Sequence, residues 1–332
     1  IARIGDTMVL ATACSGRPVE NANFLPLSVE YIAKAYSAGK IPGGFIKREG
    51  RPSSKEIRSA RQVDRPVRPL FPKGYTNETQ IIATVISADE IYDADVLAIT
   101  AASTALCLSP IPFAEPIAGV RVGMVEGELK IFPSLEETEA GELDIVVAGT
   151  ESSIMMVEGR ANELKEEVIV EALYKAHEAI KQIIGIQKEL MSSHPVTKME
   201  VPPVEVNQEI KDAVNEIISD SLHETSFLGD KMQRYGKLKE LQDQVQEALA
   251  ERFPEQERDI AEAFHEFEVA DIRSTILENQ ERIGGRGLDE IRDITCELDL
   301  LPRAHGSALF TRGETQALVS VTLGTKLDVQ LI

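Results

Sequence analysis

The sequence predicts an α+β protein made of a mixed-sheet domain, a small all-helical domain and the beginning of a second mixed-sheet domain. Strand-like and helix-like segments alternate over residues 1–191, whereas residues 207–278 contain no strand-like run. A motif near the start of the chain also returns near its end. The length of 332 residues agrees with two or three domains.

Short strands of apolar and β-branched residues are expected in the first domain. They are residues 8–13, 80–88, 143–150 and 154–159. Residues 119–132 have near-alternating apolar positions around Glu126-Gly127, which predicts a β-hairpin. Residues 93–109 are rich in small side chains and lack Gly and Pro, so they predict a buried helix. An apolar face over about 163–184 predicts a longer helix.

A linker with three prolines, residues 192–206, precedes the helical segment. Two apolar stripes at helical spacing follow it. The first is Ile210, Val214, Ile217, Ile218 and Leu222, and the second is Leu238, Leu241, Val245 and Leu249. Residues 201–270 hold 17 acids and seven bases, which predicts solvated acidic helix faces.

The motif that the two ends of the chain share is a glycine turn followed by a strand. Gly5-Asp6-Thr7 matches Gly313-Glu314-Thr315, and an apolar, β-branched run follows in both places. Internal repeats of this kind indicate duplicated modules. We therefore expect a duplicated fold whose second copy stops at Ile332.

Composition excludes several classes of protein. No apolar run approaches the roughly 18 residues of a membrane span, and no secretory leader is visible. Cys14, Cys107 and Cys296 lie far apart, which favours small core residues in a reducing compartment and hence a cytoplasmic protein. The five histidines lie far from each other and from the cysteines, which argues against a zinc site.

Positive charge gathers in one segment of this acidic chain. The net charge is −20, yet residues from Lys47 to Arg68 include eight Lys or Arg and only three acids. A Gly43-Gly44 turn there presents Phe45, Lys47 and Arg48. An aromatic ring can stack on a base while cations meet phosphates, so this loop suits single-stranded RNA.

A helix is predicted to follow, opened by Ser53 or Ser54 and ended near Pro66. Its arginines recur every three or four residues at Arg58, Arg61, Arg65 and Arg68. Arginines at this spacing share a helix face and can grip phosphate oxygens in pairs. The alternative is that Arg51, Arg61, Arg65 and Arg68 pair with Glu49, Glu56, Asp64 and acids elsewhere in the chain.

Three long segments resemble signature segments of the polynucleotide phosphorylase family: residues 41–53, 61–75 and 301–319. That family has two RNase PH-like domains, of the ribosomal protein S5 domain 2-like fold, joined by an all-helical domain. The resemblance implies a first RNase PH-like domain at 1–191, a linker at 192–206 and an all-helical domain at 207–278. Residues 279–332 would be the truncated start of the second RNase PH-like domain.

The resemblance also implies an activity and its partners. The expected protein is a homotrimeric ring that degrades single-stranded RNA from its 3′ end in mRNA degradation, with inorganic phosphate as co-substrate. Nucleoside diphosphates are released, and the reaction can run backwards as polymerisation. Mg²⁺ is expected in the part of the second core domain beyond Ile332. Other RNA-decay proteins are expected partners, and a membrane is not.

Site residues follow from the same resemblance. Residues Phe45 to Arg48 match the family's RNA-gripping loop at the central aperture, with Ile46 and Lys47 where the family usually has a second aromatic residue and a second Arg. The whole set predicted to contact RNA is Phe45, Lys47, Arg48, Arg51, Arg61, Arg65 and Arg68.

This first copy is expected to lack catalysis. Asp93 and Asp95 stand at the helix start where the family's active copy has a serine-rich phosphate loop, and they would repel an anion. The acids of residues 136–144 are expected to form a solvated turn rather than a metal site. Catalytic residues are expected beyond Ile332, and the possible edge of the active site is Arg286, Arg292, Arg303 and His305. His305 is expected to hydrogen-bond backbone and set a turn.

Two alternatives stay open. The chain could be a non-catalytic RNase PH-like ring subunit that binds and threads RNA. It could also belong to a hydrolytic nuclease that uses the acids of residues 136–144 with metal ions. On the preferred interpretation, the chain as given is inactive alone.

Overall fold

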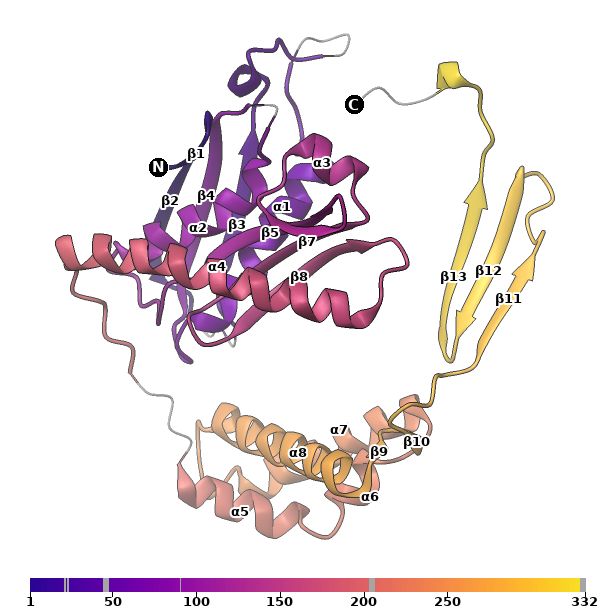
Figure 1. Cartoon of the computed structure of the whole chain (residues 1–332). Coiled ribbons are helices and arrows are strands. Elements are labelled where there is room, and N and C mark those ends of the chain that lie inside the picture. Colours follow the sequence, from indigo (N-terminus) through magenta and orange to yellow (C-terminus); the bar gives the residue numbers. More distant parts are fainter. Residues whose placement is uncertain (21, 23, 44–47, 90, 203–206, 329–332) are drawn as a thin grey trace. The chain divides into compact units, whose positions relative to one another are not determined.

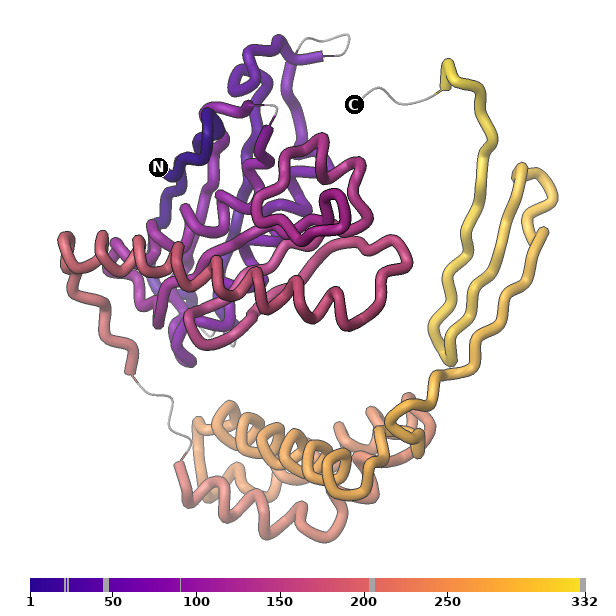
Figure 2. Tube along the Cα trace, viewed as in Figure 1, coloured from indigo at the N-terminus to yellow at the C-terminus, as the bar shows by residue number. Residues whose placement is uncertain are grey.

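The computed structural model describes the chain except for residues 21, 23, 44–47, 90, 203–206 and 329–332 (Figure 1). It divides into two compact units, Ile1–Val204 and Glu205–Ile332. Figure 2 follows the backbone of both units from end to end. Among the described residues, no helix is both long enough and apolar enough to cross a membrane.

The first unit contains two four-stranded sheets. The first has the order β1 (Ala2–Ile4), β2 (Thr7–Pro18), β4 (Asn77–Ser87), β3 (Leu27–Ala33). Because β3 runs parallel to β4 and the other neighbours are antiparallel, this sheet is mixed, as predicted. The second sheet is antiparallel, with the order β6 (Glu128–Ile131), β5 (Ala118–Val125), β7 (Leu143–Gly149), β8 (Ile154–Ala161).

Helices fill the space on both faces of the second sheet. On one face, α1 (Ser54–Val67) and α2 (Ala94–Cys107) share a core with β2, β4 and residues Val146 and Ala148 of β7. On the other face, α4 (Glu166–Ser193) packs on the alternate residues Ile145 and Val147. The shorter helices of this unit are η1 (Ala35–Ala38), η2 (Arg68–Leu70) and α3 (Leu135–Ala140).

One predicted element is confirmed and another is longer than predicted. The hairpin turn lies where expected, with Glu126 and Gly127 in the left-handed region at φ 52° and 82°. The long helix, however, continues nine residues beyond the predicted end at residue 184. Its extra turns are held because Gln187 is buried, with its amide donating to Ile117 O at 2.8 Å and accepting from Ser103 Oγ at 2.9 Å.

The proline-containing linker is fastened to the first unit. Lys198 Nζ donates to the carbonyl oxygens of Leu106, Cys107 and Ser109 at 2.8, 3.0 and 2.8 Å. These carbonyls end α2, so the ammonium group caps the helix terminus that favours a cation. The Met199 N–H also bonds Pro110 O at 2.8 Å. For this reason the compact unit extends past α4.

The second unit begins with four helices. They are α5 (Gln208–Ile218), α6 (Leu222–Ser226), α7 (Lys231–Leu249) and α8 (Glu257–Asn279). The predicted stripes form their core, with Ile210, Val214, Leu241 and Val245 buried, although Ile217 is exposed. Strands follow as β9 (Glu281–Arg282), β10 (Arg286–Gly287), β11 (Ile294–Leu298), β12 (Gly306–Arg312) and β13 (Thr315–Val321), before η3 (Lys326–Asp328).

The repeated motif forms the same hairpin twice. Gly5-Asp6 turns β1 into β2, where Ile4 pairs with Thr7. Gly313-Glu314 turns β12 into β13, where Arg312 pairs with Thr315. The two glycines have φ of 57° and 59°, a left-handed conformation that favours glycine.

The cysteine prediction was wrong for two of three residues. Cys107 is buried, but Cys14 and Cys296 are exposed. Cys14 lies on the more exposed face of β2, whose successive side chains point to opposite faces. All five residues of β11 are exposed, Cys296 among them. A strand-like neighbourhood in the sequence therefore did not show whether other elements cover the thiol.

Helix α1 begins where the sequence predicts. Ser53 is its N-cap and accepts the Glu56 N–H at 3.2 Å, while the Glu56 carboxylate accepts the Ser53 N–H at 2.7 Å. This reciprocal pair is a capping box. Pro66 lies in the last turn, so the helix ends at Val67.

Replacing Ser53 by Ala should lower the free energy of unfolding of the first unit by about 1 kcal/mol, because one N–H of the first turn loses its acceptor. Urea unfolding followed by circular dichroism measures the change. The matched control is Ser54→Ala, one residue inside the helix, which should change the stability by less than about 0.5 kcal/mol. Equal losses in both variants would contradict the capping role.

Candidate functional site

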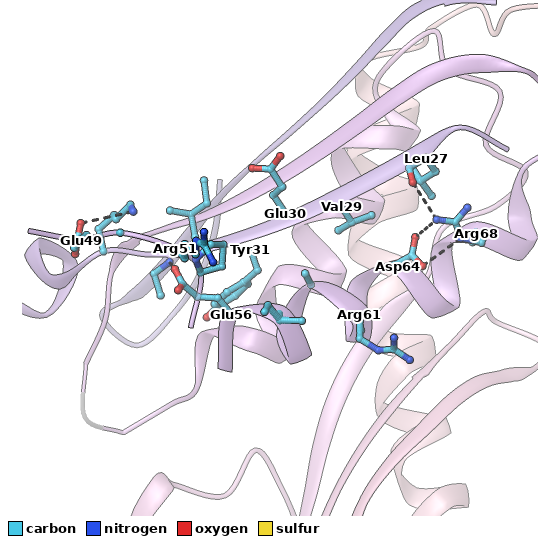
Figure 3. Close-up of a pocket in the computed structure, with 17 residues that line it drawn as sticks. Leu27, Val29, Glu30, Tyr31, Glu49, Arg51, Glu56, Arg61, Asp64 and Arg68 are labelled. Atoms are coloured by element: carbon cyan, nitrogen blue, oxygen red, sulfur yellow. Dashed lines mark hydrogen bonds and ion pairs between the residues drawn. The ribbon is translucent and has the colours of Figure 1, made fainter. Parts of the chain in front are cut away.

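A pocket of about 610 Å³ lies between the edge strand β3 and helix α1 (Figure 3). Arg51, Arg61 and Arg68 line it together with apolar residues of β3 and α1. Figure 3 shows Glu49 near one end of the pocket and the Asp64–Arg68 pair near the other, with Arg51 beside Tyr31. The pocket thus brings together three of the arginines predicted to contact RNA.

The arginines of this region fall into two groups. Arg65 Nη1 pairs with Glu158 Oε2 of β8 at 2.6 Å. Arg68 pairs with Asp64 at 2.6 Å and donates to the carbonyl oxygens of Leu25 and Leu27. Within the described residues, no hydrogen bond or ion pair is formed by the others, which are Arg48, Arg51, Arg58 and Arg61. All four are exposed.

Two acids that line the same pocket as Arg51 and Arg61 accept hydrogen bonds from backbone N–H groups. Glu56 accepts the N–H groups of Ala33 and Ser53 at 3.0 and 2.7 Å. Partial burial raises the pKa of Glu56, but these hydrogen bonds outweigh it and hold that pKa below its ordinary value. Glu49 accepts the Ala35 N–H at 2.5 Å and lies 3.7 Å from Lys34. The carboxylates are therefore engaged, and the positive charge of Arg51 and Arg61 stays available.

The predicted aromatic loop contact cannot be placed. Phe45 and Lys47 lie outside the described residues, as do Gly44 and Ile46. Arg48, the next residue of the loop, is described and exposed.

A second cavity, of about 460 Å³, lies at the start of α2. Arg121 of β5 reaches into a group of carboxylates there, 2.7 Å from Asp95, 3.2 Å from Asp144 and 3.9 Å from Asp93. Burial and then repulsion from Asp93 raise the pKa of Asp95 to about 6, although Arg121 opposes both. Lys55 of α1 completes the network, 3.0 Å from Asp93.

This cavity does not fit an attacking phosphate. Asp93 is the N-cap residue of α2 and Asp95 lies in its first turn, so carboxylates occupy the helix end that would otherwise attract an anion. Nor does it fit Mg²⁺, because the Arg121 guanidinium group already lies among the carboxylates and would repel a second cation. In the part of the chain that the structure describes, no group of three His, Cys, Asp or Glu side chains is placed to hold a metal ion.

The acids of residues 136–144 do not form one solvated turn: Glu136, Glu137 and Glu139 lie in the short helix α3, Glu142 follows it, and Asp144 lies in β7. Ser134 and Glu137 make a capping box, and Lys130 Nζ holds Glu137 at 2.6 Å. Asp144 instead faces Arg121. The side chains required for a shared metal are therefore separated.

Sequence reasoning did not identify Arg121. Its signal was a charged residue inside the apolar strand run "AGVRVGMV", at a position whose side chain is only 13% exposed. A charge that is nearly buried requires a partner. The partners were unknown because they come from α2 and β7.

The residues predicted at a possible active-site edge lie in the second unit. His305 Nδ1 accepts the Leu323 N–H at 2.9 Å, which ties the loop before β12 to the end of β13. Arg286 lies near Arg282 and Arg292, and Arg303 is exposed.

Models of known protein families match most of the chain. The model of the 3′ exoribonuclease family, domain 1, matches residues 1–112 and again 290–330, and that of domain 2 matches 115–179. The model of the polyribonucleotide nucleotidyltransferase RNA binding domain matches residues 209–287. The polyribonucleotide nucleotidyltransferase of Heliobacterium modesticaldum is 45% identical over 333 residues, covering 100% of this chain and 47% of the relative. The chain belongs to the polyribonucleotide nucleotidyltransferase family.

Other relatives give the same assignment. The polyribonucleotide nucleotidyltransferases of Geotalea uraniireducens and Syntrophomonas wolfei are each 47% identical over 329 residues, covering 99% of this chain and 47% of the relative. The chain thus spans about half the length of these members of the polyribonucleotide nucleotidyltransferase family. The crystal structure of rice (Oryza sativa) Rrp46 overlaps with a TM-score of 0.47 at 16% identity, covering 57% of this chain and 85% of that one. That likeness is too slight to add to the assignment.

Replacing Arg121 by Met should destabilise the first unit by about 3–5 kcal/mol at neutral pH, because buried carboxylates lose their counter-charge. The loss should shrink below the Asp95 pKa of about 6, since protonated carboxyls no longer repel each other. Urea unfolding on both sides of that pH measures the difference.

The matched control is Arg160→Met. Arg160 lines the same cavity and donates to the Thr138 carbonyl oxygen, but it forms no ion pair with a described carboxylate. Its cost should be about 1 kcal/mol and should not change with pH. An Arg121→Met variant that is destabilised equally at both pH values would contradict the charge network.

Proposed function

We propose that this chain is the RNA-holding half of a phosphorolytic 3′-to-5′ exoribonuclease that acts in mRNA degradation. The observation that carries the proposal is the exposure of the guanidinium groups of Arg51, Arg58 and Arg61, which form no ion pair with any described residue. Membership of the family supports the reaction, because the relatives are named polyribonucleotide nucleotidyltransferase. The catalytic centre belongs to the other half of the longer enzyme.

Free arginines on α1 suit a strand of any sequence. Arg58 and Arg61 are three residues apart on one helix, and each planar fork can bind two phosphate oxygens. Contacts to phosphate do not depend on the identity of the base. An enzyme that degrades RNA of every sequence requires contacts of this kind. By the family resemblance, Phe45, Lys47 and Arg48 would also contact the RNA. Arg65 and Arg68 would have to exchange their present partners for RNA.

The proposed reaction is attack of inorganic phosphate on the last phosphodiester of the strand. A nucleoside diphosphate leaves, and the shortened RNA keeps a free 3′ hydroxyl. One phosphate link replaces another, so the reaction also runs towards polymerisation. Mg²⁺ bound in the other half would stabilise the negative charge that develops on the phosphorus. In this half, the Asp93, Asp95 and Arg121 network supports a holding role instead of a catalytic one.

The proposed assembly is a homotrimeric ring in the cytoplasm, open to other RNA-decay proteins. Within this chain we propose a first RNase PH-like domain at 1–191, a linker at 192–206 and the all-helical domain at 207–278. Residues 279–332 would begin the second RNase PH-like domain. The double match of one family model, at 1–112 and 290–330, and the twin glycine hairpins support the duplication.

Replacing Arg51, Arg58 and Arg61 together by Gln should weaken binding of single-stranded RNA. The slope of log affinity against log salt should fall by about 2, because each phosphate contact on a single strand contributes roughly 0.7. Fluorescence anisotropy with a labelled oligoadenylate at several salt concentrations measures both changes.

The control replaces three cations of α4 by Gln: Lys175, Lys181 and Lys188. Each already has a partner within the protein, namely Leu129 O, Glu178 and Glu151. These changes should leave the salt slope unchanged. An α1 variant that keeps the wild-type affinity and slope would defeat the assignment.

Phosphate dependence tests the reaction itself. The full-length enzyme should release nucleoside diphosphates from RNA only when inorganic phosphate is present, whereas this chain alone should bind RNA without degrading it. Product analysis by chromatography distinguishes the alternatives. Monophosphates formed without phosphate would indicate the hydrolytic nuclease, and a full-length protein that binds RNA without any product would indicate the non-catalytic ring subunit.

A further inference from the structure

The first part of α7 is a basic patch in an acidic unit. Four of the seven Lys or Arg in residues 201–270 lie within residues 231–239, which contain no Asp or Glu. Elsewhere in the same region, Lys211 and Arg252 pair with Glu266 and Glu209. Among the residues described, the three lysines of residues 231–239 form no ion pair: Lys231, Lys237 and Lys239.

An exposed aromatic ring lies among these cations. Tyr235 is 58% exposed, with Lys231 Nζ 5.9 Å and Arg234 Cζ 5.7 Å from its ring centroid. Lys231, Tyr235 and Lys239 are four residues apart, so they follow one flank of the helix. Arg234 also donates to Leu228 O at 2.6 Å, which fixes its guanidinium group beside the ring. A tyrosine presented in this way contributes little to the core of the unit.

More positive charge lies beside the start of α7. The turn of the β9–β10 hairpin approaches the loop that precedes the helix, since a methyl group on Gly284 would be 3.9 Å from Gly229 O. Arg286 follows in β10, near Arg282 and Arg292. Partial desolvation and then repulsion from these two arginines lower the pKa of Arg286. The repulsion between neighbouring positive charges falls when an anion binds between them.

We infer that the α7 patch, made of Lys231, Arg234, Tyr235 and Lys239, is a second binding site for single-stranded RNA, with Arg286 beside it. A base stacks on the Tyr235 ring, and the flanking phosphates meet the cations. An acidic peptide would satisfy the charges but would leave the ring face unused, so RNA fits the patch better. The inference rests on the proposed function in taking RNA as the ligand. The family model matched at residues 209–287 is named an RNA binding domain, and the inference adds which residues of that range would make the contact.

The absence of tryptophan from the chain makes this site directly observable. In Tyr235→Trp, the single indole should be quenched when oligoadenylate is added to the whole chain, because stacking on a base quenches its emission. The control is Tyr174→Trp on α4, where the native ring is 69% exposed. That indole should not respond. Unquenched emission from Tyr235→Trp at RNA concentrations that saturate binding would overturn the inference.

Affinity gives an independent measure. Tyr235→Leu should weaken oligoadenylate binding about tenfold through loss of the stacking face. Tyr235→Phe keeps that face and should bind like the wild type. Lys231→Gln with Lys239→Gln should lower the salt slope by about 1.4, whereas Lys211→Gln, which removes a paired cation, should not change it. Thermal unfolding shows that each variant is folded. Equal affinity of the Leu and Phe variants would count against the site.

The outcomes separate this inference from the proposed function. If the α1 variant weakens RNA binding while Tyr235→Trp is not quenched, the α7 site fails and the proposed function stands. If Tyr235→Trp is quenched while the α1 variant binds normally, the α7 site stands and the α1 assignment fails. Quenching by polyglutamate as strong as that by RNA would show that the patch recognises charge without stacking, and would overturn the inference.

Discussion

Glu49 and Glu56 use their carboxylate oxygens on backbone N–H groups and not on the arginines beside them. The RNA binding proposed for Arg51, Arg58 and Arg61 depends on these hydrogen bonds. A cation can attract a polyanion strongly only if no internal anion already neutralises it. The end of β3, the start of η1 and the first turn of α1 all present unpaired N–H groups, and satisfying them occupies both acids. Because Glu49 and Glu56 accept hydrogen bonds from these N–H groups, they do not pair with Arg51 and Arg61.

The Arg121 network shows the opposite arrangement in the same unit. There the guanidinium group lies among three carboxylates and is nearly buried, so its charge is neutralised within the protein. Arginine alone therefore does not indicate a binding surface. The local supply of acids, and what else those acids bind, decides whether a given arginine serves the fold or a ligand. In the second unit, α7 satisfies the same condition more simply, because its first turns contain no acid at all.

Sequence patterns predicted local elements well. The cap at Ser53, the Glu126-Gly127 turn and the twin glycine hairpins all depend on residues a few positions apart. The partners of charged side chains were harder to predict, because Arg65 meets Glu158, 93 residues away, and Arg121 meets carboxylates from two other elements. The burial predicted for Cys14 and Cys296 was wrong for a related reason, since a strand-like pattern does not reveal whether other elements cover the strand. The fold decides which distant side chains meet, and the residue pattern of one segment does not predict how distant segments come together.

Lys198 carries a consequence for engineering. Three carbonyl oxygens at the end of α2 hold its ammonium group, so residues that read as a spacer belong physically to the first unit. A chimera that exchanged helical domains between relatives at residue 191 would replace Lys198, and the three carbonyl oxygens at the end of α2 would lose their donor. A junction placed after Pro202 would transfer the helices and leave the donor of those three bonds in place.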